Sequence, residues 1–258
     1  MKFSRAVSKR IPLLLAVGTL LLGWQVLSWS YPAYLVPPLR EILSRLFTDA
    51  FSAKFVDTAT SSLYRLVVGY GISICLALVL GLLAAPISLA RSYLRALAGI
   101  VQSVPPIAWT PFLVLILGFG ERSVLTVVVI AGLSPIVLSI LNATEGVSLN
   151  RLRLAQLFGA NRLQLTLKVY VPEIIPDLLT GIQIGLGNAW RSLIAAEMVG
   201  GVNRGLGWSL TFSSEIADMA GVIMGIAVIG ALATLIDRLI LQSLSKRLLK
   251  WREDHGSN

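Results

Sequence analysis

The sequence NRLRLAQLFGANRLQLTLKVYVP, residues 150–172, lies inside a polar interruption that runs from residue 142 to residue 177. Long apolar stretches precede and follow this interruption. The sequence is basic, and it is too long and too regularly patterned to be a simple turn. It therefore predicts a folded element that connects two hydrophobic spans.

The first half of this element is expected to be a short helix. Asn150 is a good N-cap, because its side-chain oxygen accepts a hydrogen bond from a backbone N–H group of the first turn. The helix is then expected to cover residues 151–158 and to end at Gly159, since glycine readily adopts the left-handed conformation that closes helices.

The second half allows two interpretations. Asn161 is expected to cap a segment that Pro172 and Pro176 stop. Apolar residues alternate along this segment, as is typical of a strand, at Leu163, Leu165, Leu167, Val169 and Val171. An isolated strand would leave two unpaired edges, so we expect a helix instead.

The composition indicates that this element belongs to a membrane protein. The chain has 258 residues, of which 55% are hydrophobic and 14% are charged, and its mean hydropathy is +0.79. Soluble domains carry about 25% charged residues, so lipid is expected to cover much of the surface. The net charge is +9, but the bases do not gather on one soluble face, which argues against nucleic acid as a partner.

Six stretches are long and apolar enough to cross a bilayer, for which about 20 residues are needed. They cover residues 11–29, 66–90, 96–120, 123–144, 178–199 and 219–236. We therefore expect an all-α integral membrane protein with about six transmembrane helices. The first stretch is expected to be a retained transmembrane helix; the alternative is a signal peptide, although no good small-x-small cleavage site follows.

The distribution of bases predicts the orientation of the spans. Most of the 22 basic residues fall on one side of a six-span arrangement, at Lys2, Arg5, Lys9, Arg10, Arg91, Arg95, Arg151, Arg153, Arg162, Lys168, Lys246, Arg247, Lys250 and Arg252. By the positive-inside rule this side is cytoplasmic, and both termini are then cytoplasmic as well.

The segments around the spans follow from this arrangement. Residues 1–10 are a basic cytoplasmic lead. Residues 30–62 are a periplasmic segment, in which apolar residues at helical spacing predict a short interfacial helix at 39–47. Residues 63–252 form the core domain with five of the spans, and residues 253–258 are expected to be a disordered tail.

The third span contains the proline-rich run PPIAWTP, residues 105–111. Prolines remove backbone donors and bend or break a helix. Such a break at membrane depth is tolerated where the backbone is buried or lines a wet cavity. The run is either a broken helix along a pathway, a proline-kinked packing helix, or a span that begins after Pro111. On the first interpretation, the pathway candidates are Gln102, Ser103, Pro105, Pro106 and Trp109.

The fifth span carries two charged residues, Arg191 and Glu197. Their spacing separates them by about 120° and about 9 Å on a helix, so we do not expect them to pair. Arg191, with Asn188 one turn away, faces a pathway and attracts an anion, pairs with a buried acid or a backbone carbonyl, or lies near the outer interface and snorkels there. Glu197 is a further pathway candidate, and its alternative role is to hydrogen-bond the glycine-rich loop that follows.

Motifs of catalysis are absent from the sequence. It has no phosphate-binding loop, no Gly-x-Ser-x-Gly and no His-Glu-x-x-His. Its single cysteine, Cys75, and its single histidine, His255, cannot assemble a metal site. We therefore expect no catalytic residue, metal or cofactor in this chain, and its energy must come from another molecule.

The element at 150–172 resembles the EAA loop of the permease subunits of ATP-binding-cassette (ABC) importers. Its order is Ala155, three residues, Gly159, nine residues, Val169, one residue and then Val171-Pro172. The family consensus is Glu-Ala-Ala, three residues, Gly, nine residues and Ile-x-Leu-Pro. The glutamate is replaced by Arg153, so any ion pair that this glutamate makes does not carry over.

Other motifs resemble the nitrate, sulfonate, taurine and bicarbonate permease group. Besides the proline-rich run they are GFGE at 118–121, TGI at 180–182, AAEM at 195–198, GLG at 205–207 and LLKW at 248–251. The resemblance covers roughly residues 60–252.

The resemblance implies a type I importer permease in the bacterial cytoplasmic (inner) membrane. Such a permease moves a small substrate, here an oxyanion such as a sulfonate, taurine or nitrate, by alternating access. The implied partners are a second copy of the chain, ATPase subunits that bind ATP and magnesium, and an extracytoplasmic binding protein. The ATPase would dock on the loop, at Arg151, Arg153, Leu154, Ala155, Phe158, Gly159, Ala160, Val169, Val171 and Pro172.

The rival interpretation is an ATP-independent secondary transporter or channel. It predicts an intramembrane acid for ion coupling or an inverted repeat, and the sequence shows neither pattern clearly.

Overall fold

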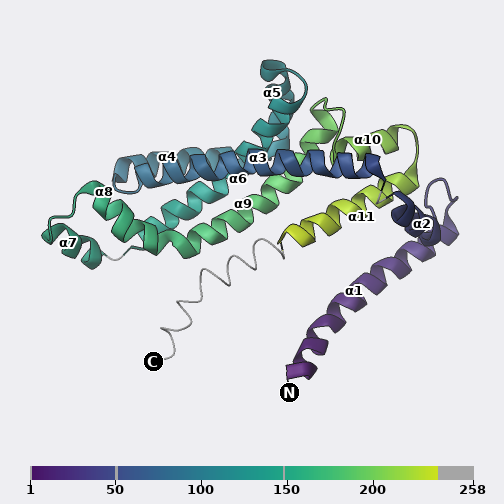
Figure 1. Cartoon of the computed structure of the whole chain (residues 1–258), viewed down its shortest axis with the longest axis horizontal. Helices are drawn as coiled ribbons and strands as arrows, with labels where there is room; N and C mark the ends of the chain where they lie inside the picture. Colours follow the sequence, from purple (N-terminus) through teal and green to yellow (C-terminus); the bar gives the residue numbers. More distant parts are fainter. Residues whose placement is uncertain (1, 50–51, 148, 238–258) are drawn as a thin grey trace. The chain divides into compact units, whose positions relative to one another are not determined.

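The computed structural model describes residues 2–49, 52–147 and 149–237, and Figure 1 shows its helices. Within these ranges all regular structure is helical, as expected. The helices are α1 (Lys2–Ser30), α2 (Leu39–Asp49), α3 (Ala53–Ala84), α4 (Ser88–Ser103), the 3₁₀ helix η1 (Pro106–Trp109), α5 (Thr110–Leu117), α6 (Glu121–Glu145), α7 (Leu149–Leu157), α8 (Arg162–Leu165), the π-helix η2 (Thr166–Tyr170), α9 (Val171–Val199), α10 (Leu206–Glu215) and α11 (Met219–Ile236). The predicted tail at 253–258 lies outside the described residues.

Three of the described helices, α3, α6 and α11, are long and apolar enough to cross a membrane. A fourth span results if α4 and η1–α5 count as one, although these halves meet at 87°. α1 has a shorter apolar part, Leu15–Ser30, and α9 carries Arg191 and Glu197. The structure thus shows an all-helical protein with three or four candidate spans in its described part, and the count of six stays a prediction.

The second predicted span has different limits from those expected. Residues 66–90 were assigned to it, but α3 covers Ala53–Ala84 and so begins inside the predicted periplasmic segment. The uncharged run stopped at Arg65, yet this side chain is only 3% exposed and is paired with acids. An arginine that is paired in this way does not end a span, because its charge is compensated within the protein.

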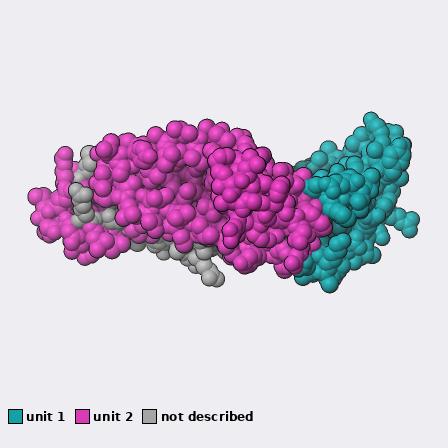
Figure 2. All heavy atoms as spheres, turned by 90° about the horizontal axis from the view of Figure 1, so that it is seen from above, with its two compact units in different colours: residues 1–57, 209–229 teal, residues 58–208, 230–258 magenta. Residues whose placement is uncertain are grey.

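The chain divides into two compact units, which Figure 2 shows in different colours. Unit 1 comprises Met1–Asp57 and Ser209–Ile229, and unit 2 comprises Thr58–Trp208 and Gly230–Asn258. The predicted 150–172 element and the predicted pathway residues all belong to unit 2.

Close packing of α3, α6 and α9 forms the core of unit 2. A Cβ atom added to Gly181 of α9 would lie 2.5 Å from the Cβ atom of Ser139 on α6, so only glycine fits there. The Tyr70 hydroxyl of α3 donates a hydrogen bond of 2.5 Å to the carbonyl of Ile182 on α9. Small residues and interhelical hydrogen bonds hold helices together in lipid, where the hydrophobic effect does not.

In unit 1, an ion pair joins α2, the helix predicted at 39–47, to the start of α11. Arg45 Nη1 lies 2.6 Å from Asp218 Oδ2. Asp218 Oδ1 also accepts a hydrogen bond of 3.2 Å from the N–H of Gly221, which caps α11. α1 presents apolar side chains outward, such as Leu20 with 74% of its surface exposed, as expected of a helix whose solvent is lipid.

Candidate functional site

The 150–172 element contains the predicted short helix, and Gly159 ends it. α7 covers Leu149–Leu157, and Gly159 follows with a φ of +78°, the left-handed conformation. The N–H of Gly159 donates to the carbonyl of Gln156 at 2.9 Å, and the N–H of Ala160 donates to that of Ala155 at 3.0 Å. These paired bonds form a Schellman cap, which satisfies carbonyls at the end of the helix.

The two asparagines of the element have different roles. Asn161 is an N-cap, as predicted, because its Oδ1 accepts a hydrogen bond of 2.8 Å from the N–H of Gln164. Gln164 Oε1 accepts one of 2.9 Å from the N–H of Asn161 in return, which completes a capping box. The cap predicted at Asn150 is wrong, because α7 begins one residue earlier, at Leu149.

Pro172 and Pro176 do not stop the second helix, contrary to the prediction. α8 leads through the π turn η2 into α9, which begins at Val171 and contains both prolines. Pro172 lies in the first turn of α9, where its missing N–H group costs little. The expected helical conformation of the segment is confirmed, and the strand alternative is excluded.

One face of the element packs inward. Ala85 at the end of α3, Val147 and Leu165 form a small buried cluster. Four residues of the element pack against it: Leu152, Ala155, Ala160 and Val169. Three of the predicted docking residues, Ala155, Ala160 and Val169, therefore fix the element in place rather than present a surface to a partner.

The other face of the element is apolar, basic and open to solvent. Leu154, Leu157 and Phe158 of this face are 54%, 82% and 89% exposed. Arg151 and Arg153 are exposed as well. Sequence reasoning missed Leu157, although it lies one turn after Leu154 on the same helix.

The proline-rich run of the predicted third span breaks the helix rather than kinking it. α4 ends at Ser103, and Val104 and Pro105 are extended, with ψ angles of 124° and 129°. η1 and α5 then continue at 87° to α4. The helix is therefore broken at this run, and its place along a pathway stays a prediction.

Three of the predicted pathway residues line one pocket of about 350 Å³, where η1 meets α9. They are Pro106 on η1 and Asn188 and Arg191 on α9, together with the buried Ser192. Arg191 Nη2 donates a hydrogen bond of 2.7 Å to Asn188 Oδ1, which orients the exposed guanidinium. An arginine has five N–H donors in a fixed fork, an arrangement that suits an oxyanion.

None of the other five pathway candidates lines this pocket. Gln102, Ser103 and Pro105 are exposed at the helix break, next to the pocket along the chain. The indole of Trp109 packs edge-on against the ring of Phe112, with 6.2 Å between the ring centroids. This contact is one of packing.

Glu197 is buried away from the pocket, in a cluster that sequence reasoning only partly anticipated. The residue is 1% exposed, and its Oε1 lies 2.7 Å from Nη1 of Arg65 on α3. Ser62 Oγ donates to the carboxylate at 2.8 Å, and the N–H of Gly207 donates at 2.9 Å. The hydrogen bond to the glycine-rich loop is thus the role that the structure shows for Glu197.

Arg65 also extends this cluster beyond Glu197. Its Nη2 and Nε lie 2.5 Å and 2.8 Å from the carboxylate oxygens of Glu121 at the start of α6. Its Nη1 donates to the carbonyl of Arg204 at 2.7 Å. The cluster formed by the buried Ser62, Arg65 and Glu197 and the exposed Glu121, hereafter the Arg65 cluster, therefore ties α3, α6, α9 and the loop after α9 together.

One feature of the sequence points to this cluster. Glu197 is an acid in an apolar span, and a buried charge of this kind needs a partner. Arg65 directly precedes the apolar run of α3, so the sequence pattern presents it as the boundary of a span rather than as that partner.

Among the described residues, no group of three or more His, Cys, Asp or Glu side chains is placed to hold a metal ion.

Three relatives of the chain point to transport. The chain is 32% identical to the taurine transport system permease protein TauC of Escherichia coli, over 98% of this chain and 95% of the relative. It is 28% identical to the putative aliphatic sulfonates transport permease protein SsuC of Bacillus subtilis, over 75% and 70%. It is 26% identical to the nitrate import permease protein NrtB of Synechocystis, over 89% and 86%.

A family comparison agrees with these relatives. Residues 77–250 match the family described as the binding-protein-dependent transport system inner membrane component. A system of this kind implies a substrate-binding protein and a separate ATPase as partners. The chain therefore belongs to the family of binding-protein-dependent transport system inner membrane components, and it is the inner-membrane permease of an ABC importer, in which ATP hydrolysis is the task of another subunit.

Proposed function

We propose that this permease imports a small oxyanion, such as a sulfonate, taurine or nitrate, and that α7 is the helix through which the ATPase drives it. Two copies of the chain, each with six spans and with both termini in the cytoplasm, form the pathway. An extracytoplasmic binding protein delivers the substrate, and Mg–ATP binds only to the ATPase subunits.

The exposed face of α7 is the observation that carries this proposal. Leu154, Leu157 and Phe158 lie three and four positions apart, so they form one apolar stripe on the helix. An amphipathic helix that lays such a stripe into a groove is a common mode of recognition between proteins. Arg153, where the family has a glutamate, favours an acidic rim on the ATPase groove.

The inward face of α7 provides the route by which a push reaches the membrane. Ala155 packs against the cluster formed by Ala85, Val147 and Leu165. The capping box between Asn161 and Gln164 fixes the start of α8, which continues through η2 into α9. A rigid-body displacement of α7 would therefore move α9, which carries Asn188 and Arg191, and rigid-body movements of this kind open and close transport pathways.

The substrate class rests on the pocket between η1 and α9, together with the named substrates of the relatives. Arg191 is held by Asn188 at 2.7 Å beside the helix break. Its charge and its fixed donors suit an anion with several oxygen atoms. We propose that the substrate passes this pocket, with Arg191 as its transient partner.

Phe158→Asp tests the docking role of α7. The change places a charge in the centre of the apolar stripe, so the affinity for the ATPase should fall by about 2 kcal/mol or more, the effect of removing an aromatic hot spot. Co-purification of the ATPase with the permease, together with substrate uptake in proteoliposomes, measures this effect.

Gln156→Asp is the matched control, because Gln156 is exposed on the opposite side of α7. It should retain both ATPase binding and uptake. Unchanged ATPase binding by a correctly folded Phe158→Asp permease would contradict the docking role.

A further inference from the structure

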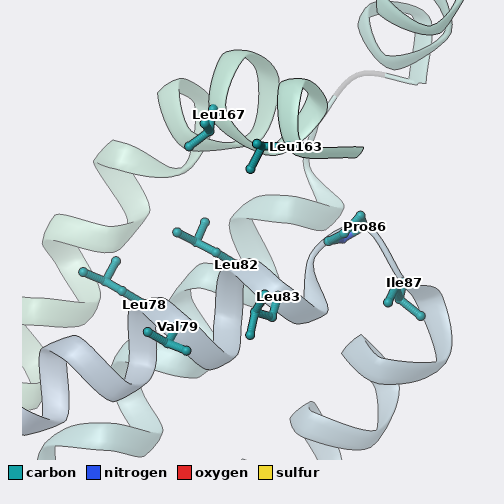
Figure 3. Close-up of a pocket in the computed structure, with 8 residues that line it drawn as sticks. All are labelled: Leu78, Val79, Leu82, Leu83, Pro86, Ile87, Leu163 and Leu167. Carbon is teal, nitrogen blue, oxygen red and sulfur yellow. The ribbon is translucent and has the colours of Figure 1, made fainter. Parts of the chain in front are cut away.

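An apolar groove runs along the end of α3 where the chain turns into α4. Four side chains of α3, between residues 78 and 83, form one wall of this groove, and Leu163 and Leu167 form the other. Pro86 and Ile87 close one end, and the volume is about 530 Å³. Figure 3 shows Leu163 and Leu167 pointing toward α3, so the groove joins a membrane span to the segment that follows α7.

The walls of the groove are open in the described part of the chain. Leu83, Leu163 and Leu167 are 69%, 66% and 56% exposed. Only 33% of the most apolar window of α3 is buried within the protein. Apolar surface of this extent on a membrane span needs an apolar cover.

The charges beside the groove favour an amphiphile as this cover. Residues 78–95 and 149–172 contain several bases and no Asp or Glu. Arg91 lies one helical turn after Ile87, and Lys168 directly follows Leu167. Arg95, by contrast, already has a partner, because its Nη2 lies 2.9 Å from Glu145 Oε1.

An apolar groove whose lining residues Ile87 and Leu167 have bases close to them in the sequence suits the two parts of an acidic lipid. Basic pockets between spans on the cytoplasmic side bind the head groups of such lipids. This end of α3 faces the cytoplasm in the orientation proposed above. A helix from a second protein copy would complement the apolar walls but would leave the bases without an anion.

We propose that the groove binds an anionic phospholipid of the cytoplasmic leaflet, with an acyl chain between α3 and the Leu163–Leu167 wall and the phosphate near Arg91 and Lys168. The lipid then bridges a fixed span and the segment that transmits movement from α7. Anionic lipid is therefore a positive effector of the coupling between ATP hydrolysis and uptake.

The test uses the assembled importer in nanodiscs of phosphatidylcholine, with or without phosphatidylglycerol. Native mass spectrometry measures retained phosphatidylglycerol, and uptake per ATP hydrolysed is measured in liposomes of the same composition. Val79→Trp fills the groove, and the double variant Arg91→Gln/Lys168→Gln removes the charges. Retention should fall about fivefold for each base removed, and the stimulation by phosphatidylglycerol should disappear in both variants.

The control variants make similar substitutions at positions outside the groove. Leu80→Trp alters an exposed residue of α3 that does not line the groove, and Arg122→Gln removes an exposed base at the other end of the core. Both should retain lipid and stimulation. Equal lipid retention in all variants would overturn the proposal. So would a photo-crosslink from position 83 to a second copy or to residues 238–258 instead of to lipid.

Discussion

At the residue scale, the decisive feature of the fold is the charge pair formed by Arg65 and Glu197. Both residues are almost fully buried, at 3% and 1% exposure, and their nearest charged atoms are 2.7 Å apart. Burial removes both charges from water, so each depends on the other and on the hydrogen bonds of Ser62 and Gly207. The pair is therefore sensitive to the loss of either partner.

Arg65→Met should destabilise the permease by about 3–5 kcal/mol, because it leaves the Glu197 carboxylate buried without its counter-charge. Thermal unfolding of the purified protein in detergent measures the effect. Glu121→Gln is the control: its side chain is 55% exposed, so loss of this ion pair should cost about 1 kcal/mol or less.

A double variant separates charge loss from lost packing. Arg65→Met combined with Glu197→Leu removes both charges, so it should be more stable than Arg65→Met alone. Relative to the unmodified protein, the double variant could instead be destabilised by the sum of the effects of Arg65→Met and Glu197→Leu. This result would show that the ion pair does not determine stability at this place.

The residues of this cluster also show why sequence reasoning found only part of the site. Glu197 was recognised as unusual because an acid in an apolar run is conspicuous. Its partner lies 132 positions away along the chain, and no local pattern connects the two. The uncharged run that predicts the span therefore begins after Arg65, whereas the helix α3 begins at Ala53.

At the element scale, the segment formed by α7, Gly159 and α8 carries the proposed docking surface. Its helix end and its second cap were predicted correctly, because glycine and asparagine act through backbone bonds to near neighbours. The effect of Pro172 and Pro176 was not, because a π turn and a proline at the start of a helix depend on how η2 and α9 join. Local rules thus predicted the caps but not the continuity of α9.

Gly159→Ala should destabilise the end of α7 by about 1–2 kcal/mol, since only glycine adopts a φ of +78° without strain. No atom lies within 4 Å of a Cβ added there, so conformation rather than crowding is the cause. Amide hydrogen exchange of residues 149–158 measures the loosening.

Gly159→Asn provides the comparison for this position. Asparagine tolerates the left-handed conformation better than alanine, so its exchange rates should stay closer to those of the unmodified protein. Equal rates for the alanine and asparagine variants would show that this conformation does not hold α7 in place.

At the scale of the whole molecule, the permease must connect an ATPase on one side to a substrate in the membrane. The proposed connection lies within unit 2 and has three parts: the exposed stripe of α7, the continuous helix from η2 to α9, and the pocket at Arg191.

Arg191→Gln should reduce uptake of an anionic substrate about tenfold or more, because hydrogen bonds to a charged group contribute about 1.5–3 kcal/mol. ATP hydrolysis stimulated by the binding protein should continue, since α7 is unchanged. Uptake and hydrolysis are measured together in proteoliposomes that contain the complete importer.

Two further variants, Arg191→Lys and Arg122→Gln, serve as comparisons for Arg191→Gln. The lysine variant keeps the charge without the planar fork and should lose part of the uptake, while Arg122→Gln, an exposed residue in the first turn of α6, should lose none. Normal uptake by the Arg191→Gln variant would show that Arg191 is not part of the substrate pathway.

The π turn η2 determines the direction in which the side chains of α9 project around the helix axis. Each residue of an α-helix turns the chain by about 100°, and η2 (Thr166–Tyr170) lies between the α7–Gly159 unit and Arg191 on one continuous helical rod. Deletion of a single residue within η2 would rotate everything after it by about that angle, so Arg191 would face a different side while every helix stayed intact. The five residues of this turn therefore set the direction in which Arg191 projects from α9.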